Sequence, residues 1–300
     1  MASFSRLIRF KSPDGRSFYA DLNHEPFQLP SQGTMTDAYR SFEDLLARRN
    51  PVEAIFHSLV APLPRDDLPI YCVGLNYKSH AEEAHLNVPL HPPVWTKPAA
   101  SLAFPGEDIS LSKFCASNFP DFEGELVFVT SKECRDVSPA EAESFILGYS
   151  VGNDLTCRMF QLPDRNGGQF FYAKAFDKFA PIGPVLVSPE VYGRAGKISL
   201  VTRVNGKVTQ SANVTEDMIF SPVEILSFMS QSTTIPAYTV VMTGTPSGVG
   251  AFKKPRQALG HEDVVEVAIT SIGSLHNRIL LPDGQSPIDM VEVPGHDDGA

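Results

Sequence analysis

The sequence predicts a mixed α/β fold that is rich in β-strands. Short apolar runs recur along the chain, glycine and proline punctuate them, and few segments carry the longer periodicity of a helix. A doubly wound fold would place a helical pattern between successive strands, and few such patterns separate these runs. We therefore expect sheets to dominate and helices to be few.

The first 66 residues are predicted to form a small N-terminal domain. Strand-like segments at residues 6–10 and 16–22 flank Ser12-Pro13-Asp14-Gly15, which is a strong turn signal. The two segments should therefore form a hairpin. Thr36 or Asp37 is then expected to cap a helix that runs to about residue 49.

Pro62, Pro64 and Pro69 interrupt the pattern as a linker would, so a second domain is predicted at residues 67–285. A flexible tail is predicted at residues 286–300. The strands expected in the second domain lie at residues 70–73, 126–130, 145–151, 184–187, 198–204, 240–243 and 263–269. The better helical patterns lie at residues 139–145 and 221–230.

Composition limits the classes of function. The chain has 300 residues, 42% of them apolar and 20% charged, which is typical of a globular protein. A net charge of −10 without a basic run argues against nucleic-acid binding, and no apolar stretch predicts a membrane span. Charges interrupt the N-terminus, and the cysteines are widely spaced without a CxxC pair, so we expect reduced thiols and a cytoplasmic protein.

Carboxylates within apolar segments are the first candidate for chemistry. Glu123 and Glu125 are two residues apart on a predicted strand, so they share a face, and Val127 follows on that face. Asp154 ends another apolar strand. Burying unpaired carboxylates is costly, and a hard divalent cation would compensate them. The alternatives are an edge strand with a charged side and an ordinary turn or cap aspartate.

His80 and Glu83 form a second candidate. They lie three residues apart at the start of a predicted helix, so the carboxylate can orient the imidazole as part of an acid/base dyad. The alternative is a solvated surface pair.

Further candidate site residues lie between Asp154 and residue 250. Lys174 is a lone cation among aromatic residues, and a buried lysine needs a carboxylate or an anionic ligand. A helix starting at Asp154 would align it with Arg158 and Gln161. Residues 243–250 form a glycine-rich loop that lacks the P-loop ending, and its amides with Thr245 could contact a substrate.

In order, these motifs resemble the fumarylacetoacetate hydrolase family over roughly residues 70–270. The series comprises Asn76-Tyr77-x-x-His80-x-x-Glu83, Glu123-x-Glu125, Gly148-Tyr149, Asn153-Asp154-x-Thr156-x-Arg158-x-x-Gln161, Lys174-x-Phe176-Asp177, Gly183-Pro184, Val204-Asn205-Gly206 and Thr243-Gly244-Thr245-Pro246-x-Gly248-Val249-Gly250.

The resemblance implies a β-roll-like catalytic domain behind a small N-terminal domain, usually in a homodimer. It implies metal ligation by Glu123, Glu125 and Asp154, commonly of Mg²⁺ and sometimes of Mn²⁺ or Ca²⁺. It also implies an active-site Lys174, a His80–Glu83 dyad on a mobile lid, and substrate contacts from Arg158, Gln161 and Thr245. Met159 and Phe170-Phe171 depart from the family pattern, which leaves the identity of the substrate open.

A metal held by three carboxylates keeps positions for two oxygens of a 2-oxo acid or β-dicarbonyl compound. The expected reaction is hydrolytic C–C cleavage of an acylpyruvate or a related dicarbonyl acid through a metal-stabilised enolate. The alternatives are a decarboxylase of oxaloacetate or another β-keto acid, which could be a biosynthetic tailoring enzyme, and a non-catalytic binding protein with the same fold.

Overall fold

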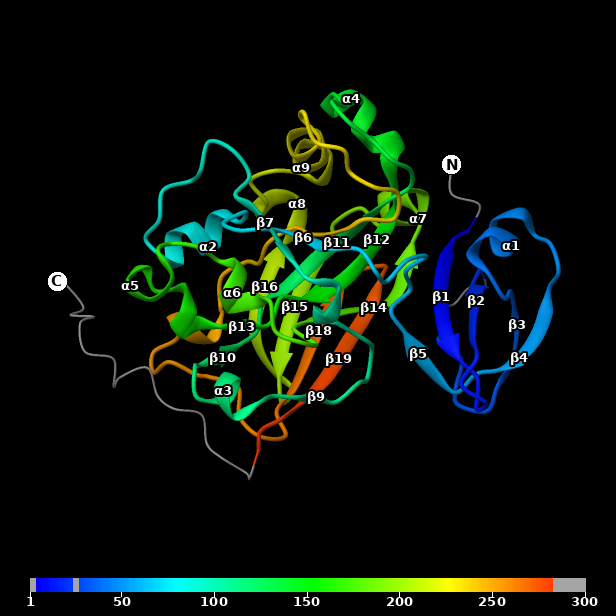
Figure 1. Cartoon of the computed structure of the whole chain (residues 1–300), viewed down its shortest axis with the longest axis horizontal. Coiled ribbons are helices and arrows are strands. Elements are labelled where there is room, and N and C mark those ends of the chain that lie inside the picture. The colour runs from blue at the N-terminus through cyan, green and yellow to red at the C-terminus, as the bar shows by residue number, and fades with distance from the viewer. Residues whose placement is uncertain (1–3, 24–26, 283–300) are drawn as a thin grey trace.

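The computed structural model describes residues 4–23 and 27–282, and strands dominate it as the sequence predicts (Figure 1). The predicted tail at residues 286–300 and the last three residues of the predicted second domain lie outside the described residues.

One large sheet forms the centre of the fold, and within the described residues it has ten strands. Its main path runs β2 (Ser17–Asp21), β1 (Arg6–Lys11), β14 (Ala180–Val187), β12 (Ile146–Asn153), β11 (Gly124–Thr130), β17 (Val240–Met242), β6 (Ile70–Val73) and β7 (Val94–Lys97). Off this path, β5 (Ser58–Val60) pairs with β1 and β8 (Leu102–Ala103) pairs with β14.

A second sheet packs beside the first and has five strands in the described part of the chain. Its order is β16 (Lys207–Asn213), β15 (Ser199–Val204), β18 (Val264–Ile269), β19 (Gly273–Leu280) and β9 (Ile109–Ser110). Two short pairs complete the strands, β3 (Met35–Ala38) with β4 (Val52–Ile55) and β10 (Pro120–Asp121) with β13 (Thr156–Cys157).

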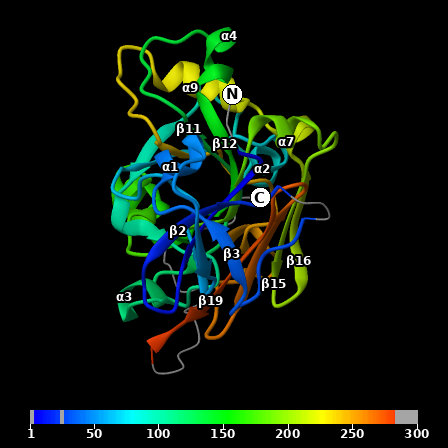
Figure 2. The same ribbon diagram turned by 90° about the vertical axis from the view of Figure 1, so that its right-hand side faces the viewer.

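The helices are short. The α-helices are α1 (Phe42–Ala47), α2 (Lys78–Glu83), α3 (Lys113–Ala116), α4 (Pro139–Ala142), α5 (Pro163–Asn166), α6 (Phe171–Lys174), α7 (Pro189–Gly193), α8 (Val214–Asp217) and α9 (Pro222–Met229). The 3₁₀ turns are η1 (Ala99–Ser101), η2 (Glu143–Phe145), η3 (Arg158–Gln161) and η4 (Gly250–Phe252). Helices α4 and α9 lie together at one end of the molecule (Figures 1 and 2). In the described residues, no helix has the length and apolar character to cross a membrane.

The N-terminal hairpin is confirmed, because β1 and β2 pair antiparallel across the predicted turn. β1 also pairs with β14, so Leu7 lies opposite Leu186 and the N-terminal segment shares the large sheet with the rest of the chain. The boundary at residue 66 stays a prediction.

The predicted helix from residues 36–37 to residue 49 is wrong in its first third. Thr36 and Asp37 lie in β3, where they pair with Ala54 and Glu53 of β4. The helix begins only at Phe42, with the Ser41 side chain accepting a hydrogen bond from the Asp44 amide at 3.1 Å. Pairing with a strand distant in the sequence outweighed the local capping signal.

β11 is an interior strand, between β12 and β17, and all seven of its residues are buried. Its side chains alternate between two apolar cores, as the sequence predicts. Val127 and Val129 lie in one core, whereas Leu126 and Phe128 lie in the other. The edge-strand alternative for the acidic segment is therefore excluded.

Gly148 in β12 tests how tightly the large sheet is packed. A Cβ at this position would lie 2.4 Å from the Val187 carbonyl oxygen of β14, which cannot rotate away. We expect Gly148→Ala to lower the free energy of unfolding by about 1–3 kcal/mol or more, as measured by denaturant unfolding. In the control Gly193→Ala, the new methyl group meets nothing within 4 Å. Equal stability of the two variants would contradict this packing.

Candidate active site

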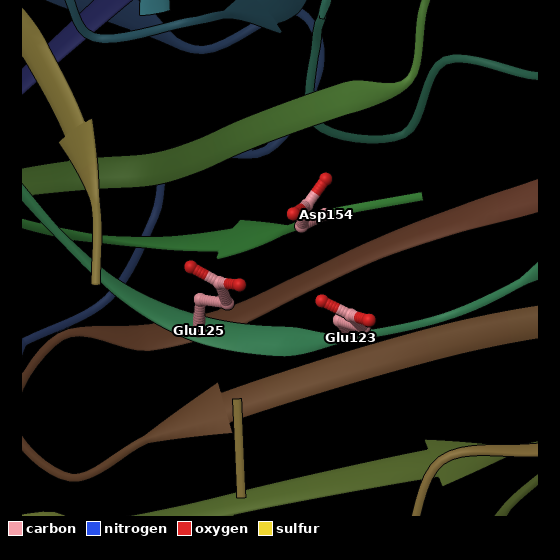
Figure 3. A group of neighbouring side chains, drawn as sticks. All are labelled: Glu123, Glu125 and Asp154. Atoms are coloured by element: carbon pink, nitrogen blue, oxygen red, sulfur yellow. The ribbon is translucent and has the colours of Figure 1, made fainter. Parts of the chain in front are cut away.

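The three predicted metal ligands lie together where β11 begins and β12 ends (Figure 3). Gly124 pairs with Asn153 in this register, which brings Glu123 and Glu125 beside Asp154. The Asp154 amide donates to the Glu123 carbonyl at 2.8 Å. One carboxylate oxygen of each residue lies within 4.8 Å of the others, and all three residues are buried.

Lys174 lies against these carboxylates, which confirms that this buried lysine has acidic partners. Its Nζ lies 2.9 Å from Glu123 Oε2, 2.7 Å from Asp154 Oδ2 and 2.9 Å from Thr156 Oγ1. These three acceptors match the three protons of the ammonium group. Lys174 therefore holds the acidic cluster together, and its contact with a substrate stays a prediction.

Lys97 of β7 is a second buried lysine that the sequence interpretation did not include. Its Nζ forms an ion pair with Asp154 Oδ1 and also donates to the carbonyl oxygens of Leu155 and Phe179, at 3.2 and 2.5 Å. The logic applied to Lys174 could have found it, since Lys97 is a lone cation in an apolar strand.

Arg158 connects the cluster to another carboxylate. Its Nη1 lies 2.6 Å from Glu123 Oε1, and its Nε lies 2.8 Å from Asp121 Oδ2. Nη1 also donates to Gln161 Oε1 at 2.9 Å, so Arg158 and Gln161 do meet. The predicted helix from Asp154 is wrong, because β13 intervenes and the 3₁₀ turn η3 begins only at Arg158. Nη2 of Arg158 is buried and has no hydrogen-bond partner among the described residues.

Glu125 differs from its neighbours because no cation within the described residues lies at ion-pair distance from it. Its Oε2 accepts a hydrogen bond from the Gly244 amide at 2.7 Å, while its buried Oε1 has no partner in the described part of the chain. Burial raises the pKa of Glu125 well above its usual value, and the charges of Asp154 and Glu123 raise it further. Burial also acts to raise the pKa of Glu123, but Lys174 and Arg158 outweigh it and lower that pKa.

The cluster fits a divalent cation. Four buried carboxylates, those of Asp121, Glu123, Glu125 and Asp154, face three buried cations, so one negative charge is uncompensated. The open oxygen belongs to Glu125, whose raised pKa shows that its ionised form lacks a compensating cation. Carboxylate oxygens are the ligands that Mg²⁺, Mn²⁺ and Ca²⁺ prefer. A bound dication would reverse the sign of the site, which would then favour an anion.

His80 and Glu83 form the predicted pair on α2. His80 Nδ1 lies 3.2 Å from Glu83 Oε2, and both side chains are largely buried. Glu83 Oε1 accepts a hydrogen bond from the Gly248 amide at 2.9 Å, so the pair is attached to the glycine-rich loop. The imidazole lies close enough to the acidic cluster that a positive charge on it would lower the pKa of Glu123. The surface-pair alternative does not fit this burial.

The amides of the glycine-rich loop bind protein carboxylates. Gly244 donates to Glu125, Gly248 to Glu83 and Gly250 to Asp121, and the amide of Ala251, directly after the loop, also donates to Asp121, all at 2.7–2.9 Å. The Thr245 hydroxyl donates to the Gly124 carbonyl at 2.9 Å and accepts from Gln210 Nε2 at 2.7 Å. The loop therefore positions the acidic residues, and substrate contact by Thr245 stays a prediction.

Aromatic residues flank one side of the cluster. The Lys174 Nζ lies 5.5 Å from the centroid of the Trp95 ring, and Phe170 meets Trp95 edge-on at 5.4 Å. Phe170 is 38% exposed, whereas Met159 packs in a small core with Phe119. Of the two departures from the family pattern, the Phe170 segment is thus the one beside the site.

Asp121 was also missed, although it continues the two-residue spacing of Glu123 and Glu125. It is fully buried and accepts hydrogen bonds from Arg158 and from the amides of Phe122, Gly250 and Ala251. Its acceptors are occupied, so it holds Arg158 and the glycine-rich loop in place.

Known proteins resemble this chain along most of its length. The family model described as "Fumarylacetoacetate (FAA) hydrolase C-terminal" matches residues 69–280. The oxaloacetate tautomerase fahd2 of Xenopus laevis is 33% identical, with 92% of this chain and 90% of that protein covered.

Two solved structures share the fold. A fumarylacetoacetate hydrolase from Exiguobacterium antarcticum has a TM-score of 0.74 at 29% identity and covers 92% of this chain and 99% of its own. A 5-carboxymethyl-2-hydroxymuconate delta-isomerase from Mycobacterium smegmatis has a TM-score of 0.73 at 28% identity and covers 92% of this chain and 98% of its own. These names cover several reactions of one enzyme family. The chain belongs to the fumarylacetoacetate hydrolase family.

Proposed function

We propose that this protein catalyses the keto–enol tautomerisation of oxaloacetate or a closely related 2-oxo acid, with a divalent cation held by Glu123, Glu125 and Asp154. The observation that carries the proposal is a cluster of three buried carboxylates beside the His80–Glu83 pair. One oxygen of Glu125 in this cluster has no hydrogen-bond partner among the described residues. The name of the Xenopus relative supports this reaction, and the isomerase name of the Mycobacterium structure supports proton transfer of the same kind.

A bound dication supplies Lewis-acid polarisation of the 2-oxo group, which makes the neighbouring C–H bond more acidic. Lys97 and Lys174 hold the carboxylates of Glu123 and Asp154 in position through ion pairs. The unpartnered Nη2 of Arg158 is a donor for a substrate carboxylate. These residues bind and orient an anion with a carbonyl group beside its carboxylate.

His80 is the proposed base. Its Nδ1 faces Glu83, so Nδ1 carries the proton and Nε2 is the free acceptor. Nε2 takes a proton from the carbon between the two carbonyl groups and returns it to a carbonyl oxygen. The enol forms without any net change in atoms, and the reverse order regenerates the ketone.

Hydrolytic C–C cleavage of an acylpyruvate is the second candidate, and the same contact favours it. Glu83 orients an imidazole that could equally activate a water molecule. Decarboxylation of oxaloacetate would break the bond to the leaving CO₂ and leave its electron pair as an enolate, which the same positive charges would stabilise. The three reactions differ in products, since only tautomerisation leaves every C–C bond intact.

Metal dependence tests the site. We expect a chelator to abolish enol–keto interconversion and Mg²⁺ or Mn²⁺ to restore it. Acylpyruvate hydrolysis and pyruvate release from oxaloacetate should be followed in parallel. Full tautomerase activity in metal-free protein would rule out the proposed role of the cluster.

Glu125→Gln separates metal binding from folding. Burial disfavours ionisation of the Glu125 carboxyl group, so replacing it by a neutral amide should raise the stability of the metal-free protein at pH 7 by about 1–3 kcal/mol. The same change should remove most of the increase in Tm that Mg²⁺ produces in the parent protein. Glu133→Gln, at an exposed position, is the control and should leave both quantities unchanged. A full Mg²⁺-induced shift in Glu125→Gln would show that Glu125 is not a ligand.

His80→Gln tests the base. We expect kcat for tautomerisation to fall by about 10²–10⁴-fold, while the Mg²⁺-induced shift in Tm stays as in the parent protein. The control is His57→Gln, at an exposed position in the N-terminal segment. A parallel loss of metal binding in His80→Gln would instead make His80 a ligand or a structural residue.

A further inference from the structure

A cavity of about 580 Å³ lies between the β15–β16 hairpin and the segment that follows η4. The hairpin contributes Lys207, and the segment contributes Lys253 and Arg256. Phe122 and Asp263 also line the cavity. This volume falls within the usual range for sites that bind small molecules.

The cavity and the acidic cluster lie on opposite sides of one segment of chain. Glu123 and Glu125 face Lys174 and the Gly244 amide. Gly124, between them, faces the second sheet, where a Cβ would meet Thr202 and Val267. Phe122 is two residues before Gly124 and lines the cavity, so it shares that side. A ligand in the cavity is therefore separate from the metal site.

The three cations form no salt bridge in the described part of the chain. Among the described residues, no carboxylate lies within ion-pair distance of Lys207, Lys253 or Arg256. The carboxylate of Asp263 is already occupied, since Oδ1 accepts from Asn205 Nδ2 at 2.7 Å and Oδ2 from the Gly260 amide at 2.6 Å.

Lys253 lies partly buried beside Phe122 in the cavity wall. It lies 5.6 Å from the centroid of the Phe122 ring. Burial lowers the pKa of Lys253; among nearby charges, Asp121 raises it, Lys207 lowers it and Glu83 raises it. The chain has a net charge of −10, so three cations around one cavity form a local concentration of positive charge.

We propose that this cavity is a second binding site, for a small anion that carries two or more phosphate or carboxylate groups. The arginine guanidinium matches the geometry of either group, and the two lysines act as point charges that accept either. Phosphorylated compounds and polycarboxylates share this chemistry. The site does not depend on the proposed reaction.

The cavity is also adjacent to the catalytic pair. Lys253 directly follows η4, in which Phe252 meets the His80 ring edge-on at 5.7 Å and Gly250 donates to Asp121. A ligand that binds Lys253 thus contacts the segment that supports both His80 and Arg158.

Calorimetric titration of the metal-free, full-length protein tests the proposal, with pyrophosphate and citrate as separate probes. Metal-free protein prevents the probes from binding through a cation at the acidic cluster, and binding is measured independently of activity. We expect saturable 1:1 binding of at least one probe and at least a tenfold loss of affinity in the Lys207→Ala/Arg256→Ala variant. Pyrophosphate alone would identify a phosphorylated ligand, and citrate alone a polycarboxylate.

The control is Lys113→Ala/Lys197→Ala, which removes two exposed charges outside the cavity and should change affinity by less than twofold. Lys207→Ala alone, at an exposed hairpin position, should weaken binding at least threefold and guards against misfolding of the double variant. Absence of binding by both probes would overturn the proposal. Unchanged affinity in a folded Lys207→Ala/Arg256→Ala variant, or an equal loss in the control, would overturn it as well.

Discussion

The burial of four carboxylates against three cations is the constraint on which the rest of the site depends. Isolated buried charges would be strongly destabilising, so each cation must be held within contact distance of its partners. Lys97 comes from β7, Arg158 from η3 and Lys174 from α6. These elements converge on the ends of β11 and β12, and the remaining uncompensated charge on Glu125 is what makes the cluster suitable for a cation.

The side chains of residues 121–125 lie in two different environments, because successive residues of an extended chain point in opposite directions. Glu123 and Glu125 face the cationic cluster, while Phe122 and Gly124 face the second sheet and its cavity. The glycine-rich loop touches both the acidic cluster and the cavity wall, since Gly244 binds Glu125 and Gly248 lies against Thr209. The loop amides bind Glu125, Glu83 and Asp121. One loop therefore positions the acidic cluster, the His80–Glu83 pair and the aspartate that binds Arg158.

Hydrolases, isomerases and tautomerases of this family can share a site because their reactions all develop negative charge beside a carbonyl group. Fixed positive charge and one positioned base serve each of them. The reaction that prevails depends on whether the base acts on a carbon-bound proton or on water. Phe170, which departs from the family pattern, lies beside Trp95 and is 38% exposed.

Much of the local structure followed from the sequence alone. Apolar runs located β6, β11, β12, β14, β15, β17 and β18, and the two-residue period placed Glu123 and Glu125 on one face. The cost of burying a lone charge predicted that Lys174 would meet a carboxylate or an anionic ligand, and the structure shows carboxylates. Such inferences succeed because they depend on neighbours within a few residues or on a transfer free energy that holds for any context.

Only the tertiary structure decided which distant residues meet. It showed that residues 36–37 pair with β4, that Lys97 and Asp121 belong to the cluster, and that the amides of the glycine-rich loop bind carboxylates. It also brought Lys207 from one hairpin to Lys253 and Arg256 of another segment. These contacts join residues far apart in the chain. The local pattern of apolar and polar residues does not indicate which distant charges will form ion pairs.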